Sequence, residues 1–400
     1  MAHHTDPLEL LTDILLEESG TDHSRHAAML LADHMLCVRE GWPTDARLGG
    51  SAKEIAAANA GWSSARDRDD VDWDRLVHAG SVVWPVILAE GREKEISGSR
   101  ALRAAHAGYE AAARSAEVLG RAHRERFHPT ATAGLVAAAV ASSVISEHTP
   151  EQTATAIGHA LSVMGGSAGA LRERSGTRQF HRSHAVRSGM AAAEAAGAGL
   201  DATRRDLIEG GGLLEPLDDF LLARSGGDAI AQASIRVYPT SGWNQCAFEA
   251  ASAAASRIQG RSERILVETT PQVVAAAAAG EGAVDEHWLS LRWAVAAASL
   301  PGSEHDEIRR TTEQVEIVER DEPGAAVTIS TADRTARYEV TVPLGHPHRP
   351  ASVADLAGKW GLPLSRMDDL IRGIDDAWAN GPGVIGLIDE LFQMTCELLD

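Results

Sequence analysis

The first stretch of the sequence with side chains suited to proton transfer combines an acidic run with a histidine. Asp67, Asp69 and Asp70 lie shortly before His78. A carboxylate beside an imidazole orients the ring and tunes its pKa, and proton transfer at neutral pH requires both. An acidic run is also typical of a solvated loop, so this motif predicts a catalytic site only together with residues from elsewhere.

A second histidine stands directly before an alanine-rich stretch with helical periodicity. His128 is followed by Pro129 and Thr130. The amino end of a helix is its positive end, so the Thr130 hydroxyl and the exposed amides there could hold an anion. The alternative interpretation is a simple capping turn. The motif therefore makes His128 and Thr130 candidates for an anion-binding position.

Two arginines place permanent positive charge in a chain that is acidic overall. Arg178 is followed three residues later by His181, and Arg236 precedes Val237 and Tyr238. A guanidinium can bind a carboxylate through two parallel hydrogen bonds, so each arginine is a candidate for holding a small acid. Arginines are also common on protein surfaces, and these two need support from the rest of the site.

A pair of histidines raises the question of a metal site. His181 and His184 lie three positions apart and share one face if this segment is helical. No carboxylate stands at a third position to complete a ligand set. We therefore interpret the pair as core or surface histidines and predict no metal site.

Hydrophobic spacing indicates a long helical part followed by a mixed one. Helical periodicity dominates to about residue 230, with stretches at 99–119, 132–145 and 184–196. Thr149 and Gln152 form a capping box at the start of a further helix. After residue 232, β-branched runs and period-two alternation predict strands at 264–268, 314–319, 326–330 and 337–342. The last two strands are close enough to form an antiparallel hairpin.

These patterns predict a fold that is mainly α with an inserted α+β domain. We expect residues 1–232 to form the first part of a large helical domain and residues 233–343 to form a smaller α+β lid domain. Residues 344–400 return to the helical domain, so that both chain ends build it. A chain of 400 residues is longer than one ordinary hydrophobic core supports, which agrees with two folded units.

Composition argues against several classes of function. Lys and Arg number 37 against 57 Asp and Glu, and the resulting charge of −20 repels nucleic acids and anionic membrane surfaces. The most apolar run, residues 134–145, is shorter than the roughly 20 residues of a membrane-spanning helix. Cys37, Cys246 and Cys396 are odd in number and far apart, which predicts no disulfide framework. We expect a soluble, cytoplasmic protein with no nucleic-acid or membrane partner.

The candidate motifs occur in the order found in the MmgE/PrpD family, which the chain resembles through most of its length. This family includes 2-methylcitrate dehydratase, cis-aconitate decarboxylase and iminodisuccinate epimerase. Its motifs are matched, with substitutions, at Asn59, 67–70, 78–81 with Pro85, 108–110 with Arg114, 128–130 with Gly134, 176–181 with Ala185 and Gly189, and 236–239. Each match alone is modest, and their order along the chain makes the resemblance specific.

The resemblance implies a helical domain made of both chain ends, an α+β lid, a homodimer and an active site without a cofactor. It also implies a small di- or tricarboxylic acid as substrate. The implied chemistry is removal or delivery of a proton beside a carboxylate. Carried over by position, Asp67, His78 and His128 are the retained catalytic residues.

The chain departs from the family at several positions of the site. Arg178 and Arg236 stand where the family has lysines, Val71 stands where a threonine is usual, and Trp293 occupies an aromatic position that is often tyrosine. Arginine keeps its proton past about pH 12, so it binds a carboxylate but is a poor proton shuttle. Proton transfer must then fall to the histidines.

The predicted activity is that of a hydro-lyase. The expected substrate-binding residues are Arg178, Arg236, Trp293, Thr130 and His181. One of the two catalytic histidines removes the proton beside the carboxylate and the other protonates the departing hydroxyl, while Asp67 orients a ring. Two alternatives stay open. One keeps the fold but ends in epimerisation or decarboxylation, and the other is a non-catalytic homologue that binds carboxylates.

Overall fold

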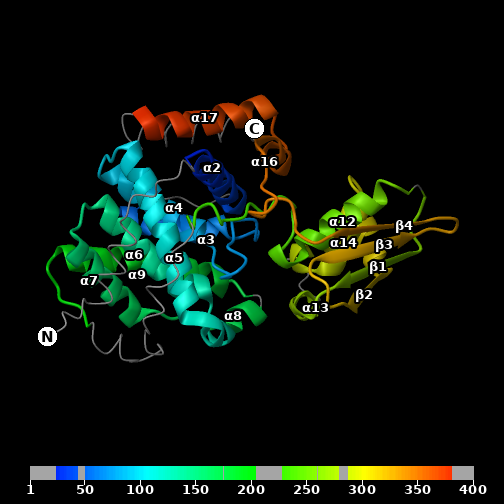
Figure 1. Ribbon diagram of the computed structural model, residues 1–400, viewed down its shortest axis with the longest axis horizontal. Coiled ribbons are helices and arrows are strands. Elements are labelled where there is room, and N and C mark those ends of the chain that lie inside the picture. Colours follow the sequence, from blue (N-terminus) through cyan, green and yellow to red (C-terminus); the bar gives the residue numbers. More distant parts are fainter. Residues whose placement is uncertain are drawn as a thin grey trace. The chain divides into compact units, whose positions relative to one another are not determined.

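The structure is a computed structural model that describes residues 24–43, 50–173, 175–203, 228–258, 260–278 and 287–380 (Figure 1). The chain divides into two compact units. Of the described residues, the helical unit comprises those from 24 to 65, from 69 to 234 and from 356 to 380, and the sheet unit comprises those from 66 to 68 and from 235 to 355. The prediction of a mainly helical chain with a smaller strand-containing part is confirmed.

The helical unit is built from a succession of helices. They are α2 (Ser24–Gly41), α3 (Ala52–Ser63), α4 (Gly80–Glu93), α5 (Gly98–Arg126), α6 (Pro129–Ile145), α7 (Pro150–Val163), α8 (Gly169–Arg172), α9 (Thr177–Gly197) and α17 (Leu364–Asn380), with α16 (Val353–Trp360) at its boundary. The capping box predicted at Thr149 and Gln152 is present at the start of α7. α5 is interrupted at Gly120, which has a φ of 68°.

The helix α6 is the buried centre of the helical unit. Every residue from Pro129 to Ser143 is buried, and α6 contacts α4, α5, α7 and α9. A helix that is apolar on all sides belongs in the interior. The approach of α9 is so close that a Cβ at Gly189 would lie 2.6 Å from the backbone oxygen of Leu135. This packing fixes the amino end of α6, where His128 and Thr130 lie.

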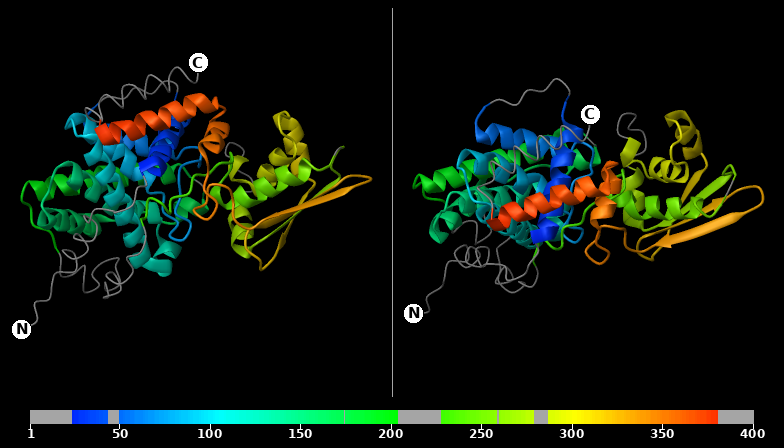
Figure 2. Two further views of the ribbon diagram at one scale, coloured as in Figure 1. Left: turned by 45° about the horizontal axis from the view of Figure 1, so that its top comes forward. Right: turned by 90° about the horizontal axis from the view of Figure 1, so that it is seen from above.

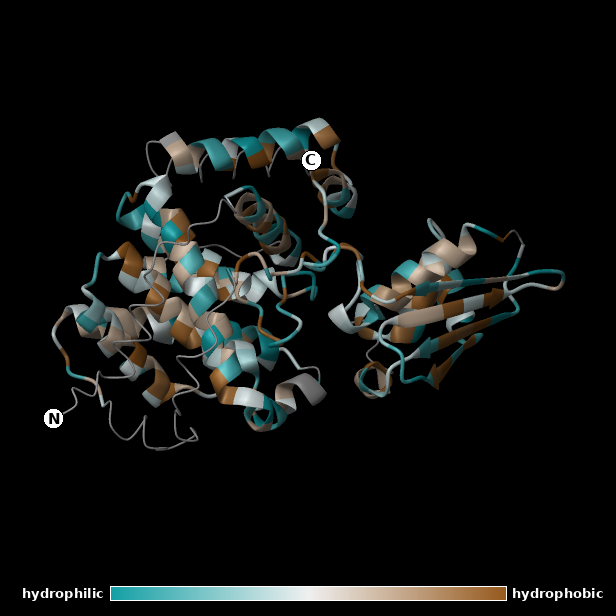
Figure 3. Cartoon of the chain, viewed as in Figure 1, coloured by the Kyte–Doolittle hydropathy of each residue, from teal (hydrophilic) through white to brown (hydrophobic). Residues whose placement is uncertain are grey.

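Helices from the two ends of the described chain pack against each other. α17 contacts α2 and α5, and Figure 2 shows α17 beside α2. α17 is amphipathic, with apolar and hydrophilic positions that follow helical spacing (Figure 3). An ion pair joins the preceding helix α16 to α2, since Lys359 Nζ lies 2.7 Å from Asp33 Oδ1 with both side chains buried.

The sheet unit contains one four-stranded mixed sheet. Its strands are β1 (Arg264–Thr269), β2 (Val315–Glu319), β3 (Ala325–Ser330) and β4 (Thr335–Val340), in the order β2-β1-β3-β4. β1 pairs with β2 in parallel, with Ile265 opposite Val315, and pairs with β3 antiparallel. β3 and β4 form the antiparallel hairpin that the sequence predicts.

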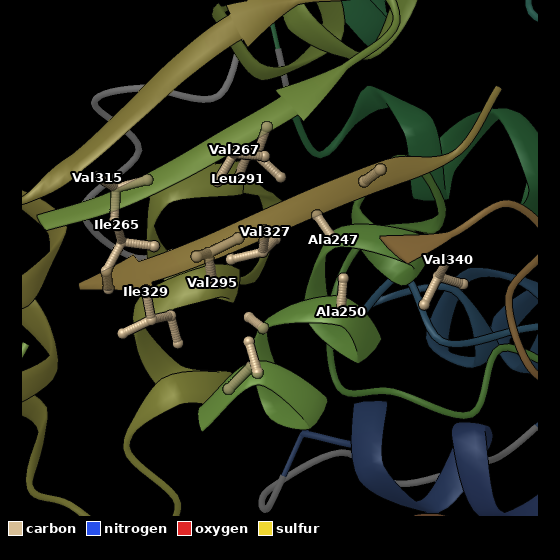
Figure 4. Close-up of a cluster of buried hydrophobic side chains, with 14 of the residues drawn as sticks. Ala247, Ala250, Ile265, Val267, Leu291, Val295, Val315, Val327, Ile329 and Val340 are labelled. Carbon is tan, nitrogen blue, oxygen red and sulfur yellow. The ribbon is translucent and has the colours of Figure 1, made fainter. Parts of the chain in front are cut away.

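One face of the sheet packs against two helices. α12 (Gln245–Ala255) and α14 (Leu291–Ser299) contribute alanines, Leu291 and Val295 to a core with the inward residues of the strands (Figure 4). The remaining elements of this unit are α13 (Pro271–Ala278), α15 (His305–Thr312), η1 (Gly242–Asn244) and η2 (His287–Leu289). Exposed ion pairs on the strands include Arg337 with Glu268 at 2.9 Å.

Two further observations concern only the part of the chain that the structure describes. None of its helices combines the length and the apolar character that crossing a membrane requires. No group of three or more His, Cys, Asp or Glu side chains is arranged there to hold a metal ion.

Candidate active site

The backbone of His78 is held on both sides in the loop between α3 and α4. Its N–H donates to Thr130 Oγ1 at 3.2 Å, and its carbonyl accepts a hydrogen bond from Ser81 Oγ at 2.8 Å. Asp72 N–H donates to the Val77 carbonyl at 2.9 Å and closes the loop before it. Thr130, which is fully buried, therefore ties His78 to the centre of the helical unit.

One nitrogen of the His78 ring faces oxygen acceptors. Nδ1 lies 2.8 Å from the backbone carbonyl of Asp70 and 3.1 Å from Asp69 Oδ2. The Asp70 carbonyl oxygen can only accept a hydrogen bond, so the neutral ring carries its proton on Nδ1 and its lone pair on Nε2. The side chain is 17% exposed. A histidine in this tautomer can act as a base through Nε2.

The carboxylate beside the His78 ring is Asp69, whereas the sequence predicted that Asp67 orients a ring. Asp69 Oδ2 lies between His78 Nδ1 and Arg182 Nη2, which is 3.2 Å away, and both Asp69 and Arg182 are buried. Asp67 belongs to the sheet unit and pairs with Arg236 Nη1 at 2.9 Å. Asp67 has a φ of 54°, in the left-handed region, and such a turn changes the direction of successive side chains, which spacing alone does not reveal.

His128 and His181 form a buried pair of imidazoles. Their Nδ1 atoms are 3.3 Å apart and their ring centroids 5.5 Å apart. His128 is the residue before α6, where its N–H donates to the Gly166 carbonyl at 2.9 Å, and its side chain does not cap the helix. At this distance one ring must present an N–H and the other a lone pair. The two rings therefore cannot both be cations.

Burial and positive charge lower the pKa of both rings. The pKa of His128 lies well below its ordinary value because of burial first and then because of the charges of Arg182, His78, His181 and Arg178. The pKa of His181 is lowered by burial and by His184 and Arg182. The cations that act on His128 define an electropositive site, which favours an anionic ligand.

The helix α9 supplies two of these cations. The sequence predicted a helix over 184–196, but α9 begins at Thr177, so Arg178, His181 and Arg182 lie on it. Residues three and four apart share a helical face. The early turns escaped prediction because polar residues occupy buried positions there, and these hide the apolar period. Arg182 was missed as a site residue, although its spacing from Arg178 was a usable signal.

The remaining predicted residues belong to the sheet unit. Arg236 is 2% exposed and paired with Asp67, so its charge is partly balanced within the protein. Trp293 lies in the first turn of α14, where its ring centroid is 4.4 Å from that of His287 and 4.3 Å from that of His305.

The structure thus brings together five of the predicted residues in the helical unit, namely His78, Thr130, His128, His181 and Arg178. Asp67, Arg236 and Trp293 lie in the sheet unit. Asp69 and Asp70 were part of the acidic motif without an assigned role, and the contacts with the His78 ring now give them one.

A family model supports the assignment of this region. The model described as the MmgE/PrpD N-terminal domain matches residues 37–215, which include the loop of His78, the start of α6 and the first turns of α9. No curated protein matches the chain.

Proposed function

Residues 37–215 belong to the MmgE/PrpD family as its N-terminal domain, and we propose that the protein is a lyase that removes water from a small carboxylic acid. The observation that carries this proposal is the His78 ring, whose Nδ1 faces Asp69 and the Asp70 carbonyl. His78 acts electrostatically on His128, as do Arg178 and Arg182. The family supports a small carboxylic acid as the substrate. The loss of water is the part of the proposal that the experiment below tests.

His78 acts as the base in this proposal. The Asp69 carboxylate at Nδ1 stabilises the imidazolium that forms when Nε2 takes a proton, as an acidic partner does in other catalytic histidines. Arg182, paired with the same carboxylate, holds Asp69 in place. The proton removed is the one beside the substrate carboxylate, and the resulting enediolate-like charge needs fixed positive charge nearby.

Guanidinium groups bind the substrate carboxylates. Arg178 is partly exposed at the start of α9 and acts electrostatically on His128, so an anion bound by Arg178 would lie near that ring. Arg236 and Trp293 remain predicted substrate-binding residues, because they occupy the lysine and aromatic positions of the family resemblance. Asp67 forms an ion pair with Arg236 and partly balances its positive charge.

His128 protonates the departing hydroxyl. In the protein without an anion its pKa is low, because burial and neighbouring cations oppose a further positive charge. A substrate carboxylate beside those cations offsets their charge, so binding raises the pKa of His128 and lets the ring carry the proton. His181, with its Nδ1 3.3 Å from that of His128, accepts or supplies the hydrogen bond that fixes the His128 tautomer.

The presence of two imidazole positions also favours a second candidate function. A base at His78 and an acid at His128 are the components of an epimerase, in which one group removes the proton and the other returns it, with no hydroxyl leaving. This reaction needs no leaving group and therefore takes a different substrate.

Deuterium exchange separates these outcomes. The purified protein is incubated in deuterated water with a panel of small hydroxylated and amino-substituted di- and tricarboxylic acids and followed by proton NMR. Dehydration gives olefinic signals and supports the proposal. Exchange or inversion without water loss supports the epimerase, and release of carbon dioxide supports a decarboxylase. Binding by calorimetry with no turnover of any acid would indicate a carboxylate-binding homologue and contradict the lyase.

A matched pair of variants tests the role of His78. We expect His78→Gln to lower kcat about 10²- to 10⁴-fold. His106→Gln is the control, because His106 also pairs with a carboxylate, Asp228 at 3.3 Å, and is 15% exposed against 17% for His78. Equal activity of the two variants would remove His78 from the mechanism.

We also propose that the protein acts as a homodimer in the cytoplasm. The family resemblance supports the dimer, and the odd, widely spaced cysteines suit a reducing compartment. Sedimentation velocity tests the assembly, and a monomer at micromolar concentration would contradict it.

A further inference from the structure

A chain of buried hydrogen bonds runs behind His78 through two helices. Trp84 Nε1 in α4 donates to Tyr109 Oη in α5 at 2.9 Å, and Tyr109 is hydrogen-bonded to the side chain of Asp70. An indole N–H can only donate, so the phenol oxygen accepts from Trp84 and directs its own O–H toward Asp70. The hydrogen bonds therefore have one direction, from Trp84 to Asp70.

Asp70 uses both its side chain and its backbone. Its Oδ2 accepts the Gly80 N–H at 3.2 Å, and its backbone carbonyl accepts the hydrogen bond from His78 Nδ1 at 2.8 Å. Anchoring the side chain at two points fixes the orientation of that carbonyl. Any movement of the Asp70 side chain would thus reach the ring of His78.

The hydrogen-bonded side chains of Trp84, Tyr109 and Asp70 are closely packed. Gly80 begins α4, and a Cβ there would collide with Asp70 Oδ1 and Tyr109 Oη. Trp84 is in turn stacked on Trp378 of α17, with ring centroids 6.4 Å apart and planes 9° apart. The start of α4 therefore packs against Asp70 and Tyr109, and Trp378 of α17 packs against Trp84.

Asp70 lies among other carboxylates, each of which has its own cation. Asp69 pairs with Arg182, and Asp33 of α2 pairs with Lys359 of α16. The pKa of Asp70 is raised to about 7 by burial and by Asp69 and Asp33, against the lowering effect of its bonds to Gly80 and Tyr109. Asp70 therefore changes its protonation near neutral pH, unlike an ordinary aspartate.

One more titratable group faces this cluster. His34 of α2 is buried, and its pKa is lowered to about 3 by burial, partly opposed by the Asp69 charge. His34 stays neutral across the range in which Asp70 titrates, so it does not obscure that titration.

We propose that Asp70, Tyr109 and Trp84 are positioning residues for His78, which hold the Asp70 carbonyl against Nδ1 and so keep the ring in the tautomer with its lone pair on Nε2. The inference rests on the proposed function for its catalytic consequence, but the tautomer itself can be measured without any substrate. Loss of the Tyr109 hydroxyl frees the Asp70 side chain and loosens its carbonyl. Asp69 Oδ2 then remains as the acceptor near Nδ1, without a hydrogen bond of its own to the ring, so the second tautomer of His78 becomes populated.

The first experiment uses NMR of the full chain without substrate. The protein contains three tyrosines, so labelling tyrosine Cζ with ¹³C gives three signals, and Tyr109→Phe assigns one of them. We expect the Tyr109 signal to titrate with a midpoint near pH 7 and to lose this titration in Asp70→Asn. A Tyr109 signal that is the same from pH 5 to 9 in the wild type would overturn the link to Asp70.

The second experiment measures the tautomer of His78 directly. With ¹⁵N-labelled histidine and His78→Gln for assignment, we expect wild-type His78 to show a protonated Nδ1 and a bare Nε2. Tyr109→Phe should show a mixture of the two forms. Tyr238→Phe is the matched control, since Tyr238 also bonds a carboxylate, that of Glu249 in the sheet unit. An unchanged single tautomer in Tyr109→Phe would overturn the proposal.

Kinetics then connect positioning to turnover. We expect Tyr109→Phe to lower kcat about tenfold with little change in KM, by analogy with the loss of partners that orient metal-binding imidazoles. If Tyr109→Phe fails to fold, Asp70→Asn provides the same tautomer readout, because it removes the charge and keeps the shape. If the wild type turns over no acid, the proposed function fails while the tautomer measurements still decide this inference.

Discussion

The helical unit buries charged groups, whereas the sheet keeps ion pairs on its exposed face. Lys359 and Asp33 have side chains 0% and 2% exposed, while Arg337 and Glu268 in the sheet are 47% and 30% exposed. Water screens the charges of the exposed pair, so this pair contributes little to the free energy of unfolding. In the helical unit, desolvation shifts the pKa values of His34, Asp70 and His128 far from their ordinary values.

The difference shows where chemistry can arise in this molecule. A shifted pKa requires exclusion of water together with nearby charge, and the densely packed alanine-rich helices supply both. The sheet has a core on one face only, so its charged side chains stay solvated. The histidines and the aspartate with the shifts described above lie in the helical unit, whereas in the sheet unit burial raises the pKa of Tyr238 and so keeps that phenol protonated.

Breaking the buried ion pair should give the largest effect on stability. Lys359→Met leaves Asp33 without its cation in a buried position, and we expect a loss of about 3–5 kcal/mol in the free energy of unfolding. Urea unfolding followed by circular dichroism measures it. A loss below about 1 kcal/mol would mean that the pair behaves like one on the surface.

Acidification should destabilise the helical unit through its buried imidazoles. The pKa of His34 is about 3 in the fold against 6.5 in the unfolded chain, so only the unfolded chain gains a proton as the pH falls below 6.5. The titration of His34 therefore leaves the free energy of unfolding unchanged above pH 6.5 and lowers it progressively toward pH 3, by a few kcal/mol in all.

The variant His34→Leu tests this sign. Between pH 6.5 and 4 its unfolding free energy should fall less steeply than that of the wild type. The remaining slope combines the other buried histidines, which act in the same direction, with Asp70, whose raised pKa stabilises the fold as the pH falls. His348→Leu, at an exposed loop position, is the control and should leave the slope as it is. An unaltered slope in His34→Leu would show that His34 does not titrate differently in the two states.

Helix caps should cost the same in both units, because capping is local. Thr149 Oγ1 accepts from Gln152 N–H in the helical unit, and Ser290 Oγ accepts from Trp293 N–H in the sheet unit, each at 3.2 Å. We expect Thr149→Ala and Ser290→Ala each to lower stability by about 1 kcal/mol in urea unfolding. A several-fold difference between them would show that the surrounding unit, not the cap, sets the cost.

The smallest effect is expected at the exposed face of the sheet. Arg337→Met removes a pair with Glu268 that water already screens, so the loss should stay below about 1 kcal/mol and shrink further in high salt. Unfolding at low and high ionic strength measures both. A loss as large as that of Lys359→Met would remove the contrast between the buried pair and the exposed pair.

Much of the secondary structure could be predicted from local patterns. The capping box at Thr149, the hairpin of β3 and β4 and the helix ending near residue 119, where Gly120 interrupts α5, all depend on neighbouring residues. The start of α9 could not be predicted in this way. His181 and Arg182 are buried there, whereas a sequence pattern predicts that polar residues are exposed.

Some residues of the candidate site could likewise be predicted from the sequence, and others could not. His78, His128 and Arg178 were identifiable from residue type and motif order, and the structure brings them into one unit. The carboxylate partner of His78 could not be identified in this way, since Asp67 and Asp69 are the same residue type in one acidic run. Only the turn at Asp67 and the contact with Arg182 distinguish them.

The sequence by itself determined the helices, the strands, the permanent charge of the arginines and the family to which residues 37–215 belong. These follow from bonds between near neighbours and from side-chain chemistry that does not depend on surroundings. The tertiary structure decided which carboxylate faces His78, which aspartate keeps a proton near pH 7 and which lysine balances Asp33 across 326 positions of the chain. Those properties depend on burial and on charges brought together from distant segments, because electrostatic free energy is set by distance in space and by exclusion of water.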